Sequence, residues 1–570
     1  MADVSDLTND YLISGQIHFT GLGSGTDFDS VIQKLVELEK QQHVKPLQDQ
    51  QKKYEDQISA IQDLNTAMLN LQSTVESMDT IKEFFIKNAT STDTSVLTAT
   101  ASSEAAEGTH TIVINQLAQN DVLISKNYFS SEDSSINDTG ADETFSYTYN
   151  GNTVSLTIPD GTTLSSFVSM INNDPNNPGV KATIIKKADG QYYFQFSGLD
   201  LGSDYAITIN EGPSSFDADS SGTVDNSDFS NTQVAQNAQI QVDGFPDDGT
   251  WIERNTNTID DVITGVTLNL KNTGTVQVTI SNDIDAIKEN IHNFVDQVNK
   301  VFDLIKEQTK ITSTAAGTQG SVLTGNYGVQ IVQQRLKSLL ARAGIGFDRD
   351  LDPYPSLSNI GITTDADQGS PTFGELKIDE AKLDEALQTN PQAVAEIFSA
   401  DYVPVTSSND FKYYSLIQGV TKAGEYDVEY EVSGGTIVSA TIDGQSASVD
   451  GNIITSLEGD SKGLAIQVDN LTDGTYTGTI RLKYGKVLEL RDELDKLTDS
   501  YDGTLHIIED NYNDIVKDLD KKISWEEDRI AQYERTLRDR FARLETVLGY
   551  YNSLNTQLTS QIASLQGNSK

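Results

Sequence analysis

Apolar residues near the start of the chain recur every three or four positions, which is the spacing expected on one face of an α-helix. Gln, Asp, Asn and Ser stand between them, so the pattern approaches the heptad repeat of a coiled coil. Pro46 separates this run from a shorter amphipathic stretch at 31–38, and a helix is expected to end or kink there. The seam positions predicted in the first run are Tyr54, Ile58, Ile61, Leu64, Met68 and Leu71.

The C-terminal region repeats this spacing over 505–565. An unbroken helix of that length would measure roughly 90 Å at about 1.5 Å per residue, which is too long to bury its apolar stripe inside one globular domain. We expect its partner to be the N-terminal helices, other copies of the chain, or both; an ordinary helical bundle is the alternative. The seam positions predicted here are Leu537, Phe541, Leu544, Leu548, Tyr551 and Leu558.

The sequence between these ends is mostly patterned as β-structure. Polar and apolar residues alternate over 88–120, on both sides of an Asn150-Gly151 turn, and through 403–484, where Asp443-Gly444 is a further turn signal. Some helices are expected here as well, because apolar residues return to helical spacing, and three of these helices follow a good N-cap residue. The expected helices are 163–173, 283–310, 329–343 and two short helices capped by Asp379 and Asn390.

The predicted fold class is therefore an α+β multidomain protein. The N- and C-terminal segments form a long helical coiled-coil hairpin, and β-rich domains are inserted between them. The expected segments are 1–45, flexible or helical; 46–87, a helical stalk pairing with 283–400 and 485–530; 88–120 with 230–282, an inner β domain; 121–229, an outer β domain; 283–402, a helical return with a small α/β part; 403–484, an inserted β domain; and 485–570, a C-terminal coiled-coil helix.

Charge separates the middle of the chain from its ends. The protein has 40 basic and 85 acidic residues among 570, for a net charge of −45. Residues 88–480 carry −35 of this, against −7 for 1–87 and −3 for 481–570. Such an excess of acid excludes simple binding to nucleic acid or to an anionic membrane, since phosphates favour basic patches. We expect the middle to face water and the ends to pack against protein. The alternative is that the β-rich domains are acidic for solubility, and the two explanations are compatible.

Composition also limits the chemistry. The absence of cysteine excludes disulfides, thiolate metal sites and a cysteine nucleophile. No apolar window is long enough to cross a membrane, and acidic residues at the N-terminus do not fit a secretory signal. Carboxylates are too numerous to single out a general acid and base, so we predict that the protein is not an enzyme. The histidines are too far apart in sequence to suggest a metal pair: His18, His43, His110, His292 and His506.

One acidic segment, 217–228, has the spacing of a twelve-residue EF-hand calcium loop. Side-chain oxygens fall at positions 1, 3, 5, 9 and 12, the position-7 residue offers its backbone carbonyl, and Gly222 occupies position 6, where the sharp turn needs glycine. The departure is aspartate instead of glutamate at position 12, and the flanks look like strand and loop. The chance spacing of an acidic surface turn is the alternative. The candidate ligands for Ca²⁺, the one cofactor expected, are Asp217, Asp219, Ser221, Thr223, Asp225 and Asp228.

The chain opens with a run from Phe19 to Glu39, followed by Pro46-Leu47. This run resembles the start of flagellar filament cap proteins, the hook-associated protein 2 family, and further similar segments are spread along nearly the whole chain. A short stretch at 163–183 resembles a repeat shared by flagellins and hook-associated proteins. The other matching segments are 257–270, 294–299, 357–364, 374–383, 390–399 and 540–565, whereas 212–230 and 403–484 look variable or inserted.

This resemblance implies functions that patterning alone does not name. Members form a ring-like oligomeric cap at the filament tip, hold flagellin beneath it and promote flagellin insertion. They are exported unfolded by the flagellar type III apparatus and work outside the cell. The terminal segments and C-terminal helix would contact the filament and an export chaperone. The outer β domains would set ring packing and, in some members, adhesion to a host surface.

The sequence is also compatible with two other functional hypotheses. The first is an extracellular adhesin that binds a host surface or glycan and happens to have coiled-coil ends. The second is a glycan-active enzyme in the β domains, which requires two suitably spaced carboxylates in a cleft. The glycine-rich run 21–25 lacks a preceding strand and a phosphate-binding lysine, so we interpret it as a flexible joint before a helix that begins near Asp27.

Overall fold

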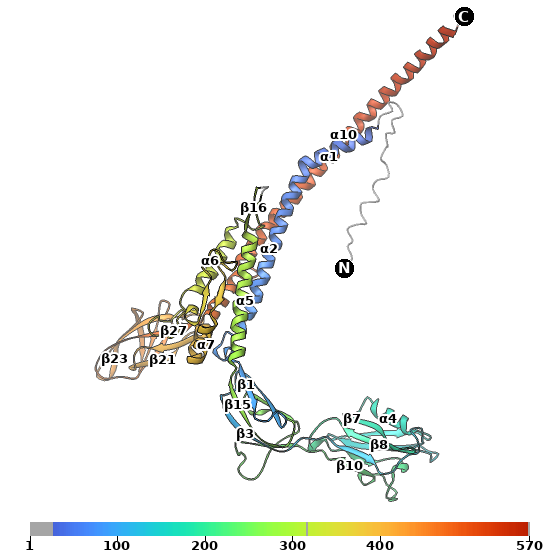
Figure 1. Ribbon diagram of the computed structural model, residues 1–570, viewed down its shortest axis with the longest axis vertical. Coiled ribbons are helices and arrows are strands. Elements are labelled where there is room, and N and C mark those ends of the chain that lie inside the picture. The colour runs from blue at the N-terminus through green and yellow to red at the C-terminus, as the bar shows by residue number, and fades with distance from the viewer. Residues whose placement is uncertain (1–26, 315–316, 568–570) are drawn as a thin grey trace. The chain divides into compact units, whose positions relative to one another are not determined.

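The computed structural model describes residues 27–314 and 317–567. The chain divides into two compact units, which we name the helical unit (Met1–Asp79 with Ile291–Lys570) and the β unit (Thr80–Asn290). Figure 1 shows the helices and strands along the chain. The run 21–25 and His18 lie outside the described residues. Within the described residues, we find no helix with the length and apolarity that a membrane span requires.

The helical unit is built around the two ends of the chain (Figure 1). The N-terminal side comprises α1 (Phe28–Glu39), a π-helical turn (Lys40–Val44) and α2 (Lys45–Glu76). The C-terminal side comprises α9 (Lys486–Thr498) and α10 (Thr504–Gly567). Helix α2 packs against α9 and α10, and α1 packs against α10. The helical hairpin predicted from the two apolar stripes is therefore confirmed.

Local sequence sets the limits of the N-terminal helices. Asp27 caps α1 by accepting a hydrogen bond from the backbone N–H of Ser30. Pro46 lies in the first turn of α2, where its missing N–H costs nothing. The π-helical turn lies directly before it, so the break expected at this proline takes the form of a wider helical turn within a continuous run.

The rest of the helical unit joins these ends. Asp379 and Asn390 cap two of its helices as the sequence predicted, through the N–H groups of Lys382 and Ala393. The elements are α5 (Ile284–Thr309, whose first residues belong to the β unit), β16 (Ile311–Thr314), β17 (Gly317–Gly320), α6 (Tyr327–Ala341), a 3₁₀ turn (Leu357–Ile360), β18 (Ile362–Thr364), β19 (Leu376–Ile378), α7 (Glu380–Thr389) and α8 (Pro391–Ser399).

In the sequence, the strands of an antiparallel β-sheet lie between α8 and α9. Its strand order is β20-β27-β22-β23-β24-β25-β26-β21. Alternate residues of β22 point into its core, including Tyr426, Val428 and Tyr430. The Asp443-Gly444 turn joins β23 to β24 with both residues at positive φ, as a tight hairpin requires. The strands are β20 (Asp401–Thr406), β21 (Phe411–Ser415), β22 (Gly424–Ser433), β23 (Thr436–Ile442), β24 (Gln445–Asp450), β25 (Ile453–Ser456), β26 (Ala465–Val468) and β27 (Gly474–Tyr484).

The β unit contains two separate apolar cores. The first belongs to the sheets β1-β15-β3-β11-β12 and β13-β14-β2. Its chain segments come from both sides of the second core in sequence. The elements are α3 (Ile81–Phe84), β1 (Lys87–Ser91), β2 (Leu97–Ala101), β3 (Gly108–Gln116), β11 (Ala238–Val242), β12 (Ile252–Arg254), β13 (Thr258–Ile263), β14 (Val266–Leu270) and β15 (Gly274–Asn282).

The second core is rich in aromatic side chains and lies between the sheets β10-β4-β8-β7 and β6-β5-β9, with α4 packed on β7. Thr163 caps α4, as predicted. The elements are β4 (Val122–Ser125), β5 (Glu143–Tyr149), β6 (Asn152–Ile158), α4 (Leu164–Asn172), β7 (Val180–Ala188), β8 (Gln191–Gly198), β9 (Thr208–Glu211), β10 (Phe229–Gln233) and 3₁₀ turns at Ser203–Tyr205, Ser214–Phe216 and Asn226–Asp228.

Candidate assembly seam and metal centre

The pairing of α1 and α2 with α9 and α10 forms what we call the terminal seam. Along α2, the predicted positions Ile61, Leu64, Met68 and Leu71 are all almost fully buried. Tyr54 is half-buried, and its ring centroid lies 5.5 Å from that of Tyr512 on α10. Ile58 is half-buried as well. The apolar spacing of this run thus marks the face that the chain buries against its own C-terminal helices.

Toward the C-terminal end of α10 the seam is formed with α1. Phe28 stacks on Phe541 with ring centroids 4.9 Å apart. Arg538 donates to Asp29 across the same pair of helices at 2.8 Å. Leu537, one turn before the stacked phenylalanine, is buried. Aromatic stacking and a charge-assisted hydrogen bond therefore fix the register of α1 against α10.

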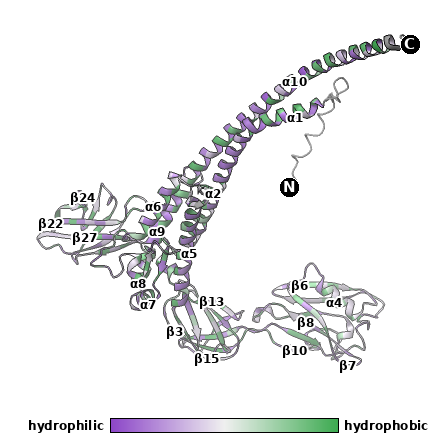
Figure 2. Cartoon of the chain, turned by 45° about the horizontal axis from the view of Figure 1, so that its top comes forward, coloured by the Kyte–Doolittle hydropathy of each residue, from purple (hydrophilic) through white to green (hydrophobic). Residues whose placement is uncertain are grey.

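Beyond Phe541 the apolar stripe of α10 continues, but its side chains are exposed to solvent. The predicted positions Leu544, Tyr551 and Leu558 are exposed by 42%, 63% and 50%, whereas Leu548 is half-buried. Figure 2 shows apolar residues recurring among polar ones along this part of the helix. We name the open stripe the distal stripe; its exposed members are Leu544, Val547, Tyr550, Tyr551, Leu554, Leu558 and Ile562.

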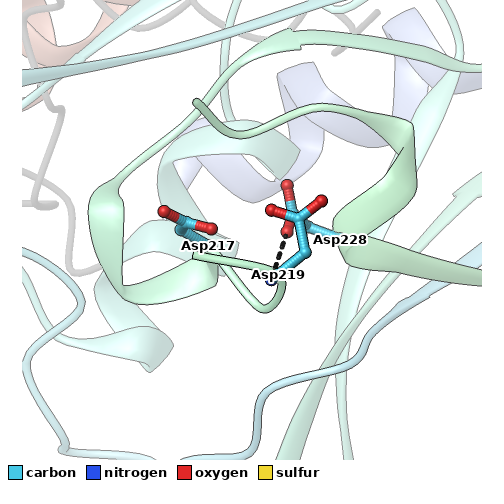
Figure 3. A group of neighbouring side chains, drawn as sticks. All are labelled: Asp217, Asp219 and Asp228. Atoms are coloured by element: carbon cyan, nitrogen blue, oxygen red, sulfur yellow. Dashed lines mark hydrogen bonds between the residues drawn. The ribbon is translucent and has the colours of Figure 1, made fainter. Parts of the chain in front are cut away.

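The candidate calcium loop follows a buried core residue, Phe216, and ends at another, Phe229. Carboxylate oxygens of Asp217, Asp219 and Asp228 all lie within 4.8 Å of one another. Figure 3 shows the side chains of Asp219 and Asp228 beside each other, with Asp217 facing them across the loop. The loop therefore gathers three of the six predicted ligands around one point. Short 3₁₀ turns and strands flank it instead of two helices, as the sequence indicated.

Hydrogen bonds within the loop fix its ends. Asp228 is fully buried, and its carboxylate accepts the N–H groups of Ala218 and Asp225 at 2.7 and 3.0 Å. The Asp219 carboxylate accepts the backbone N–H of Ser221 at 2.9 Å and the hydroxyl of Ser227 at 3.1 Å. The hydrogen bonds with Ser221 hold the pKa of Asp219 below its ordinary value.

The remaining predicted ligands are oriented differently. The Asp225 carboxylate accepts the N–H of Ser227 at 2.6 Å and stands outside the three-carboxylate group. That contact with Ser227 lowers the pKa of Asp225. The Ser221 hydroxyl donates to the backbone carbonyl of Thr223 at 2.9 Å, so these two oxygens lie next to each other. Gly222 has φ of +85°, the left-handed conformation that a glycine at position 6 supplies.

A carboxylate outside the loop adds to this site. A cavity of about 440 Å³ is lined by Glu143 together with Asp217 and Thr223. One oxygen of Glu143 accepts the N–H of Ser214, but its Oε2 is buried and has no hydrogen-bond partner within the described part of the chain. A buried carboxylate oxygen without a partner is costly, and a cation in this cavity would compensate it. No sequence pattern connects Glu143 with this site, because it lies far from the loop in the chain.

The helical unit contains a buried ionic cluster that the sequence did not predict. Asp352 is bound by Arg481 and by Lys483, the latter at 2.7 Å, and Lys483 also reaches Glu396 at 2.8 Å. Burial would raise the pKa of Asp352, but the hydrogen bonds from Lys483 and Arg481 hold it below its usual value. Basic residues in a strand ordinarily predict an exposed face, so their pattern concealed this cluster.

A second buried charge lies at the start of α9. Lys486 is fully buried and donates to the carbonyls of Leu339 and Ala343, at the C-terminal end of α6, at 2.9 and 3.0 Å. It also pairs with Glu489 at 3.0 Å, which in turn binds Arg342 at 2.6 Å. Burial lowers the pKa of Lys486 despite its neighbour Glu489. An ammonium at the end of a helix satisfies carbonyls that otherwise lack donors.

Comparison with known proteins places these features in context. Residues 235–553 match the family model of the flagellar hook-associated protein 2 C-terminus, and residues 24–121 match that of its N-terminus. The A-type flagellar hook-associated protein 2 of Pseudomonas aeruginosa is 27% identical over 406 residues, covering 67% of this chain and 80% of the relative. Flagellar hook-associated protein 2 of Escherichia coli K12 is 27% identical over 395 residues, with the same coverage of each chain.

A solved structure is also similar. The D1-D2-D3 domains of the flagellar cap protein FliD from Escherichia coli share 27% sequence identity with this chain. The match covers 60% of this chain and 91% of that one, with a TM-score of 0.46.

Proposed function

The chain belongs to the flagellar hook-associated protein 2 family, and from this premise we propose that it forms an oligomeric cap at the tip of the flagellar filament and promotes flagellin insertion there. On this proposal its partners are other copies of itself, flagellin, the filament tip and a flagellar export chaperone. It leaves the cell through the flagellar type III apparatus and works outside. The role is structural and needs no catalytic site.

The family match carries this proposal, and the distal stripe gives it a physical basis. The terminal seam uses the chain's own residues up to Phe541. Beyond that point α10 offers apolar side chains that no described residue of the same chain covers. An amphipathic helix with an uncovered apolar face gains free energy by packing on a neighbouring helix. Contacts of this kind suit a cap that must both hold its neighbours and exchange them.

The test replaces the distal stripe without disturbing the chain's own fold. The variant changes Leu544, Tyr551 and Leu558 to serine, and complements a strain that lacks the gene. Because these side chains are exposed, circular dichroism and the melting temperature should stay unchanged. We expect filaments to be short or absent and purified protein to show no rings by electron microscopy.

The matched control changes residues on the opposite face of α10. Thr546, Ser553 and Ser560 are exposed and stand about 200° around the helix from the three stripe positions. Changing all three to alanine should leave filament length as in wild type. Full-length filaments in the gene-deletion strain itself would overturn the cap proposal, and mucin or glycan binding in that case would favour an adhesin.

We also propose that the 217–228 loop binds one calcium ion. The grouping of Asp217, Asp219 and Asp228 supports this, because calcium takes six to eight oxygen ligands at short range. The buried, unpartnered oxygen of Glu143 in the adjoining cavity supports it independently. The ion would supply a positive charge that joins the loop to β5. The expected affinity is modest, about 10⁻⁴–10⁻³ M, as in extracellular modules.

Calorimetric titration of the full chain with calcium, after treatment with chelator, tests this site. We expect one binding event, lost when both Asp217 and Asp219 are changed to asparagine. Asp228 is left intact because its carboxylate holds the loop together. Asp204→Asn, an exposed change in the same β unit, should bind calcium as wild type does. No heat from the wild-type protein at millimolar calcium would refute the proposal.

A further inference from the structure

A cavity of about 480 Å³ opens between α5, α6 and the loop that precedes β19. Phe302 of α5 lines it, and the Nζ of Lys337 on α6 lies 5.2 Å from the centroid of that ring. Phe373, from the loop, stands at the cavity with 46% of its surface exposed. Gly374 lies against Lys337 so closely that a Cβ there would fall 2.8 Å from Nζ. The cavity thus combines an ammonium group with two aromatic rings.

Lys337 differs from the other lysines at this cavity, which each form an ion pair. The neighbouring Lys306 pairs with Glu375 at 3.2 Å, and Lys310 pairs with Glu307 at 3.3 Å. Lys337 makes neither an ion pair nor a hydrogen bond with any residue of the described ranges 27–314 and 317–567. Burial, together with the nearby charge of Lys306, lowers the pKa of Lys337, and the more favourable charge of Glu375 offsets this only in part. A carboxylate entering the cavity would relieve both effects.

The loop between α9 and α10 presents groups that complement this cavity. Tyr501 is 89% exposed, the highest value among the large apolar and aromatic side chains of the described residues. Asp502 beside it is exposed too. The Asp499 carboxylate accepts the backbone N–H groups of both, at 2.7 and 3.0 Å, which fixes the backbone of the turn. Gly503 permits the tight turn, since a Cβ there would lie 2.3 Å from the Asp499 carbonyl oxygen.

The loop between α9 and α10 lies on a different face of α6 from the cavity, so it does not reach the cavity of its own chain. Arg335 of α6 contacts Glu493 of α9 at 3.4 Å, so that face of α6 is turned toward α9. Lys337 is two residues further on, or about 200° around the helix, and faces α5. The loop follows directly after α9. The cavity and the loop therefore lie on two different surfaces of the helical unit. A head-to-tail contact between copies requires such a pair of surfaces.

We propose that the Tyr501–Asp502 pair of one copy docks in the Lys337 cavity of a second copy of this chain. The Asp502 carboxylate binds the Lys337 ammonium group, and the Tyr501 ring packs on Phe373. The contact is heterologous, so repeating it joins copies head to tail, and a rotation that closes gives a ring. This inference rests on the proposed self-assembly and specifies one contact in it. The strongly acidic surface makes an unpaired lysine the natural point of attraction between copies.

A charge exchange tests the contact in the full chain. Sedimentation velocity of Lys337→Glu and of Asp502→Lys should each show self-association at least about tenfold weaker than wild type. The double variant should regain most of that loss, because the pair is restored with its signs reversed. Tyr501→Ser should weaken association as well. Lys412→Glu, on β21 outside the cavity and paired with Asp469 at 3.1 Å, makes the same change of charge and is the matched control, which should associate as wild type does.

The outcomes separate this contact from the cap role itself. Unchanged association in both single variants, or no recovery in the double variant, overturns the docking contact. If wild-type protein then still restores filaments to the deletion strain, the cap proposal stands without this contact. A synthetic peptide with the sequence of 498–504 should compete with self-association; competition equally strong with its Asp502→Lys form would also overturn the inference.

Discussion

Phe28 and Phe541 lie at opposite ends of the sequence, and their rings stack at 4.9 Å with an interplanar angle of 28°. This contact is where α1 begins and where α10 starts to expose its apolar stripe. The chain closes on itself by joining its two ends, although several hundred residues separate them. Loop-closure entropy rises only logarithmically with length, so this separation is not prohibitive. The β-rich segments with their own apolar cores can therefore lie in the sequence between the paired helices.

Removing the ring of Phe541 should loosen α1 without unfolding the protein. Phe541→Ala removes an aromatic pair and part of the seam, and we expect local opening of α1 to become easier by about 1–2 kcal/mol. Hydrogen exchange followed by mass spectrometry should show about tenfold faster exchange over 28–44. Tyr551→Ala, further along the same helix and exposed, should leave exchange in that segment unchanged. Equal protection in both variants would mean that the stacked pair does not hold α1.

The terminal seam could be predicted because its information is local. Apolar residues every three or four positions define a helical face by themselves, and Ile61, Leu64 and Met68 are buried where that spacing placed them. What the spacing could not supply was the identity of the partner. The same pattern continues through Leu544 and Tyr551, yet these are exposed in the single chain. A stripe predicts that something covers it, but it does not say which molecule does.

The calcium loop and the buried ionic cluster also differ in whether the sequence alone could predict them. The loop's ligands are spaced within twelve residues, so a sequence pattern reveals Asp217, Asp219 and Asp228 together. Asp352 and Lys483 are far apart in the chain, and only the tertiary fold joins them. Their burial could not be predicted either, because charged side chains are almost never fully buried unless they are paired.

Calcium should stabilise the β unit. For a dissociation constant of about 10⁻³–10⁻⁴ M, 10 mM calcium adds about 1.4–2.7 kcal/mol to the free energy of unfolding. Scanning calorimetry with calcium and with chelator should therefore show a transition raised by several degrees. The paired change of Asp217 and Asp219 to asparagine should abolish this rise, whereas Asp204→Asn should keep it. A rise that survives the paired change would place the ion elsewhere.

The stability of the helical unit should fall in acid partly through Asp352. Its pKa in the folded state is below the ordinary value of 3.8, so the ionised carboxylate stabilises the fold above about pH 4. This contribution is lost as the pH falls through the folded-state pKa. Asp352→Asn leaves Arg481 and Lys483 short of a partner, and should cost about 3–5 kcal/mol at pH 7.

Urea unfolding at pH 7, 5 and 3 measures this dependence. The difference between wild type and Asp352→Asn should be nearly constant from pH 7 to pH 5 and should shrink at pH 3. Asp350→Asn, an exposed change in the same loop, should follow the wild-type curve throughout. A difference that stays the same down to pH 3 would show that the charge of Asp352 is not what stabilises the cluster.

Lys486 should act as a coupled pair with Glu489. Lys486→Met keeps the length of the side chain but removes the donor to the Leu339 and Ala343 carbonyls, and we expect a loss of about 2–4 kcal/mol. Glu489→Gln should lower the free energy of unfolding less in the Lys486→Met background than in wild type, because the buried carboxylate has already lost a counter-ion. The coupling free energy between the two changes should be about 1–2 kcal/mol. Denaturant unfolding of the four proteins measures it. Lys496→Met, exposed on the same helix, should change stability by no more than about 0.5 kcal/mol; strictly additive losses would contradict the pairing.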